Sequence, residues 1–391
     1  MDASHPSPLA QQIQQAIGQA LREMGKVNIL IAGSTGVGKS TLTNAIFERP
    51  VTPEGIGRTV TKETREWTNE HSPLTLFDTR GLEQVYYREI LQGLRDYIDG
   101  RRKSRDHSKH IHIAWVCILE ASKRVEQAHI ELVEMLSDYM PVIVVITQCT
   151  YDGGFNDEVQ RLLPKANAFV RVRAKTIVLD DGHVSKDMGL PDLVKATAQL
   201  IPESERRAFI AAQWVNLTMK QQQAQIIVGT SIATAAAGGA IPIFNGVAPT
   251  ITQIVMISLI NQLWGFYPST TFMISLFGII MAGVMTTLGV GHILASLIPI
   301  LGSLPAAIIA AVSTLVIGEA YITSLMVLTR KNPDRSHTEP EVLNEMKHQL
   351  PQHLKKGKLS QLVRQYMKLA EIRKKLPKSL VDELDKVAQE E

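Results

Sequence analysis

The sequence predicts an α/β domain with a doubly wound, mostly parallel sheet, followed by an all-α hydrophobic helical domain. Short apolar, β-branched runs alternate with helical stretches between residues 27 and 147, a pattern typical of parallel strands covered by helices. A glycine-rich loop separates the first of these runs from a helical stretch. Residues 221–318 contain no Asp, Glu, Lys or Arg, although these four types make up 20% of the chain. Such a segment is either embedded in a bilayer or sealed among helices.

Length and charge limit the class of protein. The 391 residues suggest two or three folded units at roughly 150 residues each. The 41 Lys and Arg residues nearly balance the 38 Asp and Glu residues, with a net charge of +3, so we expect no nucleic acid partner. Cys117 and Cys149 stand in apolar runs, without the spacing of a metal site or a disulfide framework. The first residues lack a basic start followed by an apolar stretch, so no secretory signal peptide is expected.

The chain divides into four expected segments. Residues 1–26 form an amphipathic helix, because Leu9, Ile13, Ile17 and Leu21 recur at helical spacing. Residues 27–200 form the α/β domain, residues 201–328 the hydrophobic helical domain, and residues 329–391 a charged, basic tail. Within the α/β domain we expect strands at 27–32, 74–77, 111–119 and 142–147, and a solvated basic loop at 101–110.

A phosphate-binding loop follows the first predicted strand. It matches G-x-x-x-x-G-K-[ST], and its residues are Gly33, Ser34, Thr35, Gly36, Val37, Gly38, Lys39, Ser40 and Thr41. The glycines allow backbone N–H groups to turn toward a β-phosphate, and the following helix adds the partial positive charge of its N-terminus. We expect Lys39 to reach the β- and γ-phosphates and the Ser40 hydroxyl to ligate Mg²⁺. The alternative is a glycine-rich turn that only joins a strand to a helix.

A second motif, D-x-x-G, follows the predicted strand 74–77. Asp78 can contribute to the coordination shell of the Mg²⁺ ion, and the backbone N–H of Gly81 can contact a γ-phosphate. Between the two motifs, residues 55–61 form a glycine-containing stretch that offers threonine hydroxyls to the metal. The D-x-x-G motif alone is weak, but its place about forty residues after the phosphate loop makes it specific.

With these motifs, residues 27 to about 180 resemble an Era-like or septin-like GTPase domain of the translation-factor class. The resemblance implies a G-domain fold that binds GTP with Mg²⁺ and hydrolyses it. It also implies that Thr61, with Thr59 as the alternative, is the switch-I threonine that ligates the metal and acts with Lys39 in catalysis. Asp78 and Gly81 then belong to switch II. The later hydrophobic part, with residues 240–243 and 254–257, resembles the uncharacterised C-terminal domain of bacterial membrane-associated GTPases. A homodimer through the G domain is a further expectation.

The base-side motif departs from this family. Where such proteins have [NT]-K-x-D, this chain has Thr147, Gln148, Cys149 and Thr150. We expect Thr147 and Gln148 to contribute to the nucleotide site, but the carboxylate that accepts hydrogen bonds from guanine is missing. Asp152 lies two residues further on and is the candidate to replace it. The sequence therefore predicts a GTP preference that is weaker than in relatives with the full motif.

Two other departures bear on catalysis. Leu82 stands where small GTPases often have a glutamine that orients water, which predicts slow intrinsic hydrolysis. Gly36 stands where potassium-activated relatives have asparagine, which argues against that mode of activation. Ala174 and Lys175 resemble the last base-side motif, and an ordinary strand end explains them equally well.

The charge-free segment is long enough for up to four bilayer spans of roughly 20 residues each. The candidates are residues 226–244, 251–267, 272–290 and 306–328. Lys and Arg residues flank the segment on both sides, which predicts cytoplasmic flanks and an even number of crossings. The nucleotide domain and the tail are then cytoplasmic, and the basic tail can lie on anionic membrane lipid. The alternative is a water-soluble bundle whose inner helices are apolar on all sides.

The leading hypothesis is a slow, Mg²⁺-dependent GTPase that acts as a nucleotide switch coupled to a membrane-embedded helical domain. The alternatives are an ATP-using P-loop enzyme, a dynamin-like remodelling protein, and a pore-forming or structural membrane protein with a degenerate nucleotide site. The D-x-x-G motif disfavours the first, and the lack of a long charged helical stalk disfavours the second. The intact Lys39, Ser40 and Asp78 disfavour the third.

Overall fold

The fold was analysed in a computed structural model of the chain. The structure describes residues 8–47, 57–59, 64–68, 73–79, 87–178, 180, 182–237, 251–289, 306–332, 337–368, 373–374, 376 and 378–389. These residues belong to two compact units, one of residues 24–217 and one that combines residues 1–23 with residues 218–391.

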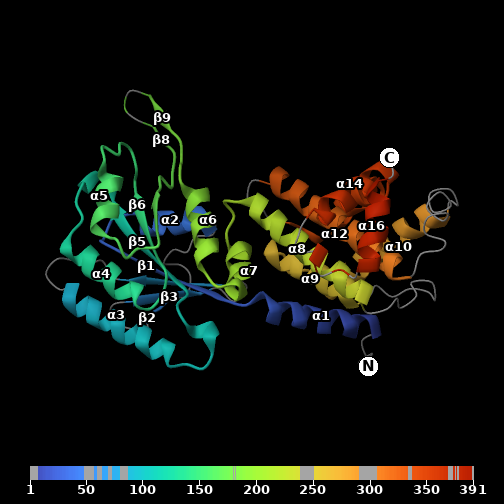
Figure 1. The fold of residues 1–391 in the computed structure, drawn as a ribbon, viewed down its shortest axis with the longest axis horizontal. Coiled ribbons are helices and arrows are strands. Elements are labelled where there is room, and N and C mark those ends of the chain that lie inside the picture. Colours follow the sequence, from blue (N-terminus) through green and yellow to red (C-terminus); the bar gives the residue numbers. More distant parts are fainter. Residues whose placement is uncertain are drawn as a thin grey trace, which may run out of the picture. The chain divides into compact units, whose positions relative to one another are not determined.

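The first unit is built around a seven-stranded sheet with the strand order β2-β3-β4-β1-β5-β6-β7 (Figure 1). The strands of its parallel part are β1 (Val27–Gly33), β4 (Leu74–Thr79), β5 (Ile113–Leu119), β6 (Val142–Thr147) and β7 (Ala168–Arg171). An antiparallel edge is formed by β2 (Gly57–Thr59) and β3 (Thr64–Thr68). The predicted mostly parallel sheet is confirmed, and the four predicted strands correspond to β1, β4, β5 and β6.

Helices cover both faces of this sheet, which explains why every residue of β1 and β6 is buried. One face packs against α3 (Tyr87–Arg102), α4 (Gln127–Ser137) and α5 (Phe155–Leu162). The other face packs against α2 (Lys39–Phe47), α6 (Leu190–Leu200) and α7 (Glu203–Ala212). There the Trp115 ring stacks on Phe47, with centroids 6.1 Å apart, and its Nε1 donates to the Thr197 hydroxyl at 3.1 Å.

Shorter elements complete the first unit. The predicted basic loop at 101–110 contains the end of α3 and the 3₁₀ turn His107–Lys109. A second 3₁₀ turn, Glu120–Ser122, follows β5, and β8 (Ile177–Val178) pairs with β9 (Val184–Ser185) in a small hairpin. Helix α7 belongs to this unit, although its residues fall in the predicted helical domain, because Phe209 packs edge-on against Phe47 in the core.

The second unit is helical. Apart from Met24 and Leu217, which fall in the first unit, its elements are α1 (Pro8–Met24), α8 (Leu217–Ala237), α9 (Ile251–Leu263), α10 (Thr270–Gly289), α12 (Ala306–Lys331), α13 (Glu339–His353), α14 (Lys356–Met367) and α16 (Lys378–Gln389). Helix α13, from the predicted charged tail, packs against both α10 and α12. Its buried residues Val342, Met346 and Leu350 recur every four positions, so the tail uses an apolar stripe to cover the hydrophobic helices.

Polar side chains join the helices of this unit in its interior. The buried Glu319 of α12 accepts hydrogen bonds from Gln225 Nε2 at 3.1 Å and from the Tyr366 hydroxyl at 2.5 Å. The Tyr321 hydroxyl donates to Asn261 Oδ1 at 2.5 Å. These contacts fix helices from the charge-free segment and from the tail in one arrangement.

Among the described residues, the segment Ala311–Lys331 of α12 is long and apolar enough to cross a bilayer. The apolar stretches Ile251–Leu263 and Thr270–Ile280, which fall in two other predicted spans, are shorter. Most of the α12 stretch is buried inside the helical unit, and a core helix of a globular protein has the same length and composition. Residues 238–244 and residue 290, which end two of the predicted spans, lie outside the described residues.

Candidate functional site

The glycine-rich loop joins β1 to α2 at the carboxyl edge of the sheet. Gly33, Gly36 and Gly38 have φ values of +146°, +77° and +98°, in the region that residues with a Cβ rarely adopt. At Gly33 the space is also closed, since a Cβ would lie 2.5 Å from the Cys117 carbonyl oxygen. The chain therefore needs glycine where the loop leaves β1 and passes over β5.

Lys39 lies at the first position of α2, and its side chain reaches back over the loop. Its Nζ donates to the Gly33 carbonyl at 2.9 Å and to the Ser34 carbonyl at 3.1 Å. Around it Thr35, Gly36 and Ser40 are exposed. The ammonium group is thus held among backbone groups at an open surface, next to a helix N-terminus, as an anion site requires.

Asp78 lies at the same edge of the sheet as the loop. It is the next-to-last residue of β4 and is opposite Ile31 in the parallel ladder between β4 and β1, two residues before Gly33. Its carboxylate and the Ser40 hydroxyl are hard oxygen donors of the kind Mg²⁺ binds, so this donor set fits the expected metal. Thr61 and Gly81 lie outside the described residues, as does the side chain of Thr59.

Thr147 and Gln148 contact the phosphate loop. The Thr147 hydroxyl lies 2.7 Å from the Val37 carbonyl, to which it donates, and 3.2 Å from the Ile118 carbonyl. Gln148 has a φ of +53°, and its Nε2 donates to the Gly36 carbonyl at 3.1 Å. The residues at the end of β6 therefore stabilise the phosphate loop through hydrogen bonds to its carbonyl groups. The sequence motif alone does not reveal this role.

An ion pair between the buried Glu120 and the half-buried Arg171 lies beside the predicted base-side motif. Glu120 accepts a hydrogen bond from the Thr150 backbone N at 2.6 Å and another from Arg171 Nε at 2.8 Å. Burial opposes ionisation of Glu120, but these hydrogen bonds outweigh it and hold the pKa of the carboxyl below its usual value. Glu120 and Arg171 belong to no motif, and the sequence offered no signal for either.

Asp152, the predicted replacement for the guanine carboxylate, points elsewhere. Its Oδ1 accepts from the Asn156 backbone N at 3.0 Å, in the first turn of α5, and lies 3.4 Å from Arg171 Nε. Lys123 Nζ donates to the Asp152 carbonyl at 2.7 Å and also to the Tyr151 carbonyl. The carboxylate is therefore committed to the helix start and to Arg171.

The buried thiol beside the loop does not fit nucleophilic chemistry. Burial raises the pKa of Cys117 to about 12, despite the opposing effect of Lys39, so the thiolate is not populated near neutral pH. Within the described ranges, no group of three or more His, Cys, Asp and Glu side chains is placed to hold a metal ion.

Comparison with known proteins agrees with this geometry. Residues 28–148 match the family described as 50S ribosome-binding GTPase. Septin-8-B of Xenopus laevis is 26% identical over 156 residues, a match that covers 34% of this chain and 36% of the septin. The chain thus spans about a third of the length of this curated relative. The family match covers residues 28–148 of the first unit, which spans residues 24–217, and does not extend into the helical unit.

Solved structures with a similar fold cover the same part of the chain. A probable GTP-binding protein engB aligns with a TM-score of 0.31 at 16% identity, over 44% of this chain and 98% of that one. Toc33 from Arabidopsis thaliana in complex with GDP and Mg²⁺ aligns with a TM-score of 0.31 at 16% identity, over 49% and 90% of the two chains. The FeoB G-domain from Methanococcus jannaschii gives a TM-score of 0.27 at 18% identity, over 45% and 98%.

Proposed function

We propose that this P-loop GTPase domain binds GTP with Mg²⁺, hydrolyses it slowly, and acts as a nucleotide switch for a membrane-embedded helical unit. The observation that carries the proposal is the position of Lys39 Nζ, 2.9 Å from the Gly33 carbonyl, inside a loop of positive-φ glycines at the edge that also carries Asp78. This combination of a cation, backbone N–H groups and a carboxylate can bind a polyphosphate, whereas a turn that only joins a strand to a helix does not require it.

Each residue of the site has a distinct part in the proposal. The backbone N–H groups of the loop bind the phosphate oxygens, and Lys39 neutralises charge on the β- and γ-phosphates. Thr147 keeps the loop in place through its bond to Val37. Ser40, Asp78 and, by resemblance, Thr61 hold the metal, which when bound neutralises the charge that develops on the phosphates. Leu82 in place of a glutamine supports slow turnover.

A second candidate, an ATP-using enzyme, is favoured by the base side of the site. Thr150 replaces the guanine-accepting carboxylate, and Asp152 is held by Arg171 and by the start of α5. Without an acceptor for guanine N1 and N2, a site cannot strongly reject adenine. We retain GTP as the preferred nucleotide because residues 28–148 match a GTPase family.

Nucleotide competition tests the choice of base. We expect ATP to displace labelled GTP from the full chain only at higher concentration, with a smaller margin than in GTPases that carry the full motif. Because its carboxylate has other partners, Asp152→Ala should leave the ratio of the two affinities unchanged, as should the control Asp157→Ala at an exposed position of α5. Equal competition by ATP and GTP would establish the second candidate, and a selective loss of GTP binding in Asp152→Ala would return Asp152 to the base site.

The membrane part of the proposal rests on α12 and on the charge pattern. Residues 221–318 carry no charged side chain, Ala311–Lys331 has the length of a span, and Lys and Arg flank the block on both sides. These features support an even number of crossings, with the nucleotide domain and the tail in the cytoplasm. The basic residues of the tail favour contact with anionic lipid.

Alkaline extraction tests membrane insertion. We expect the full chain to remain in the membrane pellet after a carbonate wash, because hydrophobic burial in lipid does not depend on charge. A peripheral protein and an integral protein of the same membranes serve as controls. Release of the chain together with the peripheral control would support the soluble bundle and a peripheral tail.

A further inference from the structure

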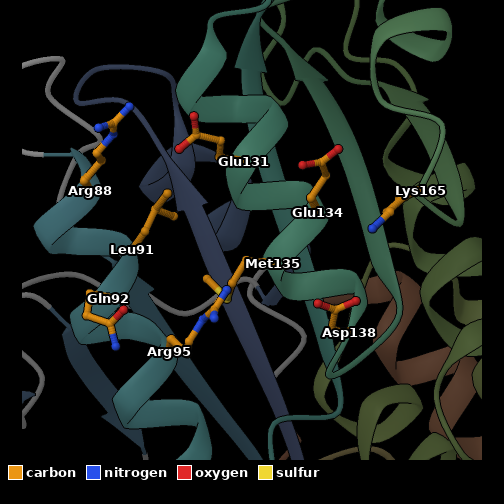
Figure 2. Close-up of a pocket in the computed structure, with 9 residues that line it drawn as sticks. All are labelled: Arg88, Leu91, Gln92, Arg95, Glu131, Glu134, Met135, Asp138 and Lys165. Carbon is orange, nitrogen blue, oxygen red and sulfur yellow. The ribbon is translucent and has the colours of Figure 1, made fainter.

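An open groove of about 440 Å³ lies between α3 and α4 on the surface of the first unit (Figure 2). Its floor contains Leu91 and the buried Met135, and its rims carry charged side chains. Its lining residues contact neither the glycine-rich loop nor Asp78 in any described hydrogen bond or ion pair. An inference drawn from this groove therefore does not depend on the nucleotide chemistry.

The two rims carry opposite charge. Figure 2 shows Arg88 and Arg95 on α3, Glu131 and Glu134 on α4, and Asp138 at the end of α4. On each helix the lining residues follow the spacing i, i+3, i+4 and i+7, which places them on one helix face. The positive rim and the negative rim therefore run side by side for the length of the groove, with Lys165 beyond the negative rim.

The opposite charges form no direct ion pair across the groove, although Arg88 interacts electrostatically with Glu131. In residues 87–178, all of which the structure describes, no ion pair joins α3 to α4 across the groove. Arg88 Nε contacts the Tyr87 hydroxyl at 3.3 Å, and that hydroxyl in turn donates to Glu131 at 3.3 Å. Arg95, Glu134 and Asp138 are exposed. Arg95 on one rim and Glu134 and Asp138 on the other thus keep charge available to a partner.

The direction of the helices decides which partner fits. α3 and α4 precede neighbouring parallel strands, β5 and β6, and therefore run parallel to each other. Arg88 then lies beside Glu131 at one end of the groove, and Arg95 lies toward Asp138 at the other. Two copies of this surface can face each other across a two-fold axis that runs parallel to the helices. That axis places the α3 of each copy on the α4 of the other, so the surface is complementary to itself.

We propose that this groove is the contact surface of a homodimer, in which the α3 rim of each protomer meets the α4 rim of the other. A two-fold axis across the groove would instead place α3 on α3 and bring like charges together, so the charge pattern selects one of the two orientations. The half-buried Leu91 supplies an apolar centre above the buried Met135. The charged rims set the orientation and accelerate association.

Charge exchange between two variants of the full chain tests the dimer. Arg88→Glu with Arg95→Glu makes both rims acidic, and Glu134→Lys with Asp138→Lys makes both rims basic. We expect each variant alone to dimerise at least tenfold more weakly than the unmodified chain in sedimentation velocity at low salt, because like charges then face each other. An equimolar mixture of the two variants should restore the dimer, since an acidic groove then meets a basic one.

The controls separate this contact from misfolding and from other surfaces. Glu89→Lys with Lys103→Glu changes two exposed charges of the same segment outside the groove and should leave dimerisation unchanged. All variants should bind nucleotide as the unmodified chain does, because none alters the phosphate site. An unmodified chain that is monomeric at tens of micromolar, single variants that dimerise normally, or a mixture that stays monomeric would each overturn the proposal.

Discussion

Replacement of Lys39 by alanine should lower the affinity for GTP at least tenfold while the first unit stays folded. The substitution removes an ammonium group that the loop holds next to the expected phosphates, 2.9 Å from the Gly33 carbonyl. A charge-assisted hydrogen bond is worth roughly 1.5–3 kcal/mol, and each 1.4 kcal/mol corresponds to a factor of about ten in affinity. Titration of the full chain with a fluorescent GTP derivative measures the change.

The control for this prediction is Lys26→Ala. Lys26 is exposed and precedes the same strand, β1, at the end opposite to the loop. The Lys26→Ala substitution therefore removes an equal charge far from the loop. We expect its affinity to match that of the unmodified chain. Unchanged affinity in a folded Lys39→Ala variant would show that the nucleotide does not bind at this loop.

Alanine at Gly189 is expected to produce the largest loss of stability in the first unit. Gly189 has a φ of +77° where the chain enters α6, and a Cβ there would lie 1.8 Å from the Arg171 carbonyl oxygen. Relief of that overlap requires α6 to move away from the end of β7. We expect a destabilisation of at least about 3 kcal/mol, which for a unit of this size lowers the melting temperature by roughly 6 °C or more.

Gly182→Ala is the matched control for this second prediction. Gly182 has nearly the same φ, +82°, but a Cβ there would meet no atom within 4 Å. Gly182→Ala should therefore lower the free energy of unfolding only by the backbone strain, about 1 kcal/mol. Thermal unfolding, combined with hydrogen exchange of peptides from β7 and α6, distinguishes the two variants. Equal effects would mean that the contact with Arg171 is relaxed without cost.

The fold could be predicted from the sequence where a local pattern carries the information. The runs that became β1, β4, β5 and β6 are apolar and β-branched because helices bury both of their faces, and the phosphate loop has a spacing that backbone geometry dictates. Helix α7 was assigned to the neighbouring domain because its sequence is helical and mixed in charge. In the structure α7 contacts β1 and β4, and Phe209 packs edge-on against Phe47, so α7 belongs with the sheet.

The phosphate side of the site was more predictable than the base side. Lys39 and Ser40 follow a contiguous motif, whereas Glu120 and Arg171 are 51 residues apart and meet through strand order. Asp152 has the carboxylate that guanine recognition needs and lies two residues from the motif position. In the structure that carboxylate instead contacts the first turn of α5 and Arg171. A sequence motif records which groups are present, and competition among neighbours for hydrogen bonds decides where they point.

The buried carboxylate of Glu319 limits how α12 could enter a bilayer. A charged side chain at the centre of a membrane costs about 2.5–3.5 kcal/mol even on the most lenient insertion scales. Here the Gln225 amide and the Tyr366 hydroxyl of α14 satisfy that carboxylate. If α12 crossed the bilayer alone, Glu319 would lose these two hydrogen-bond donors. Its carboxylate would then have to take up a proton or find new hydrogen-bond donors. Insertion that preserves the bonds must instead bring α8 and α14 along, so that part of the charged tail would have to follow the hydrophobic helices into the lipid.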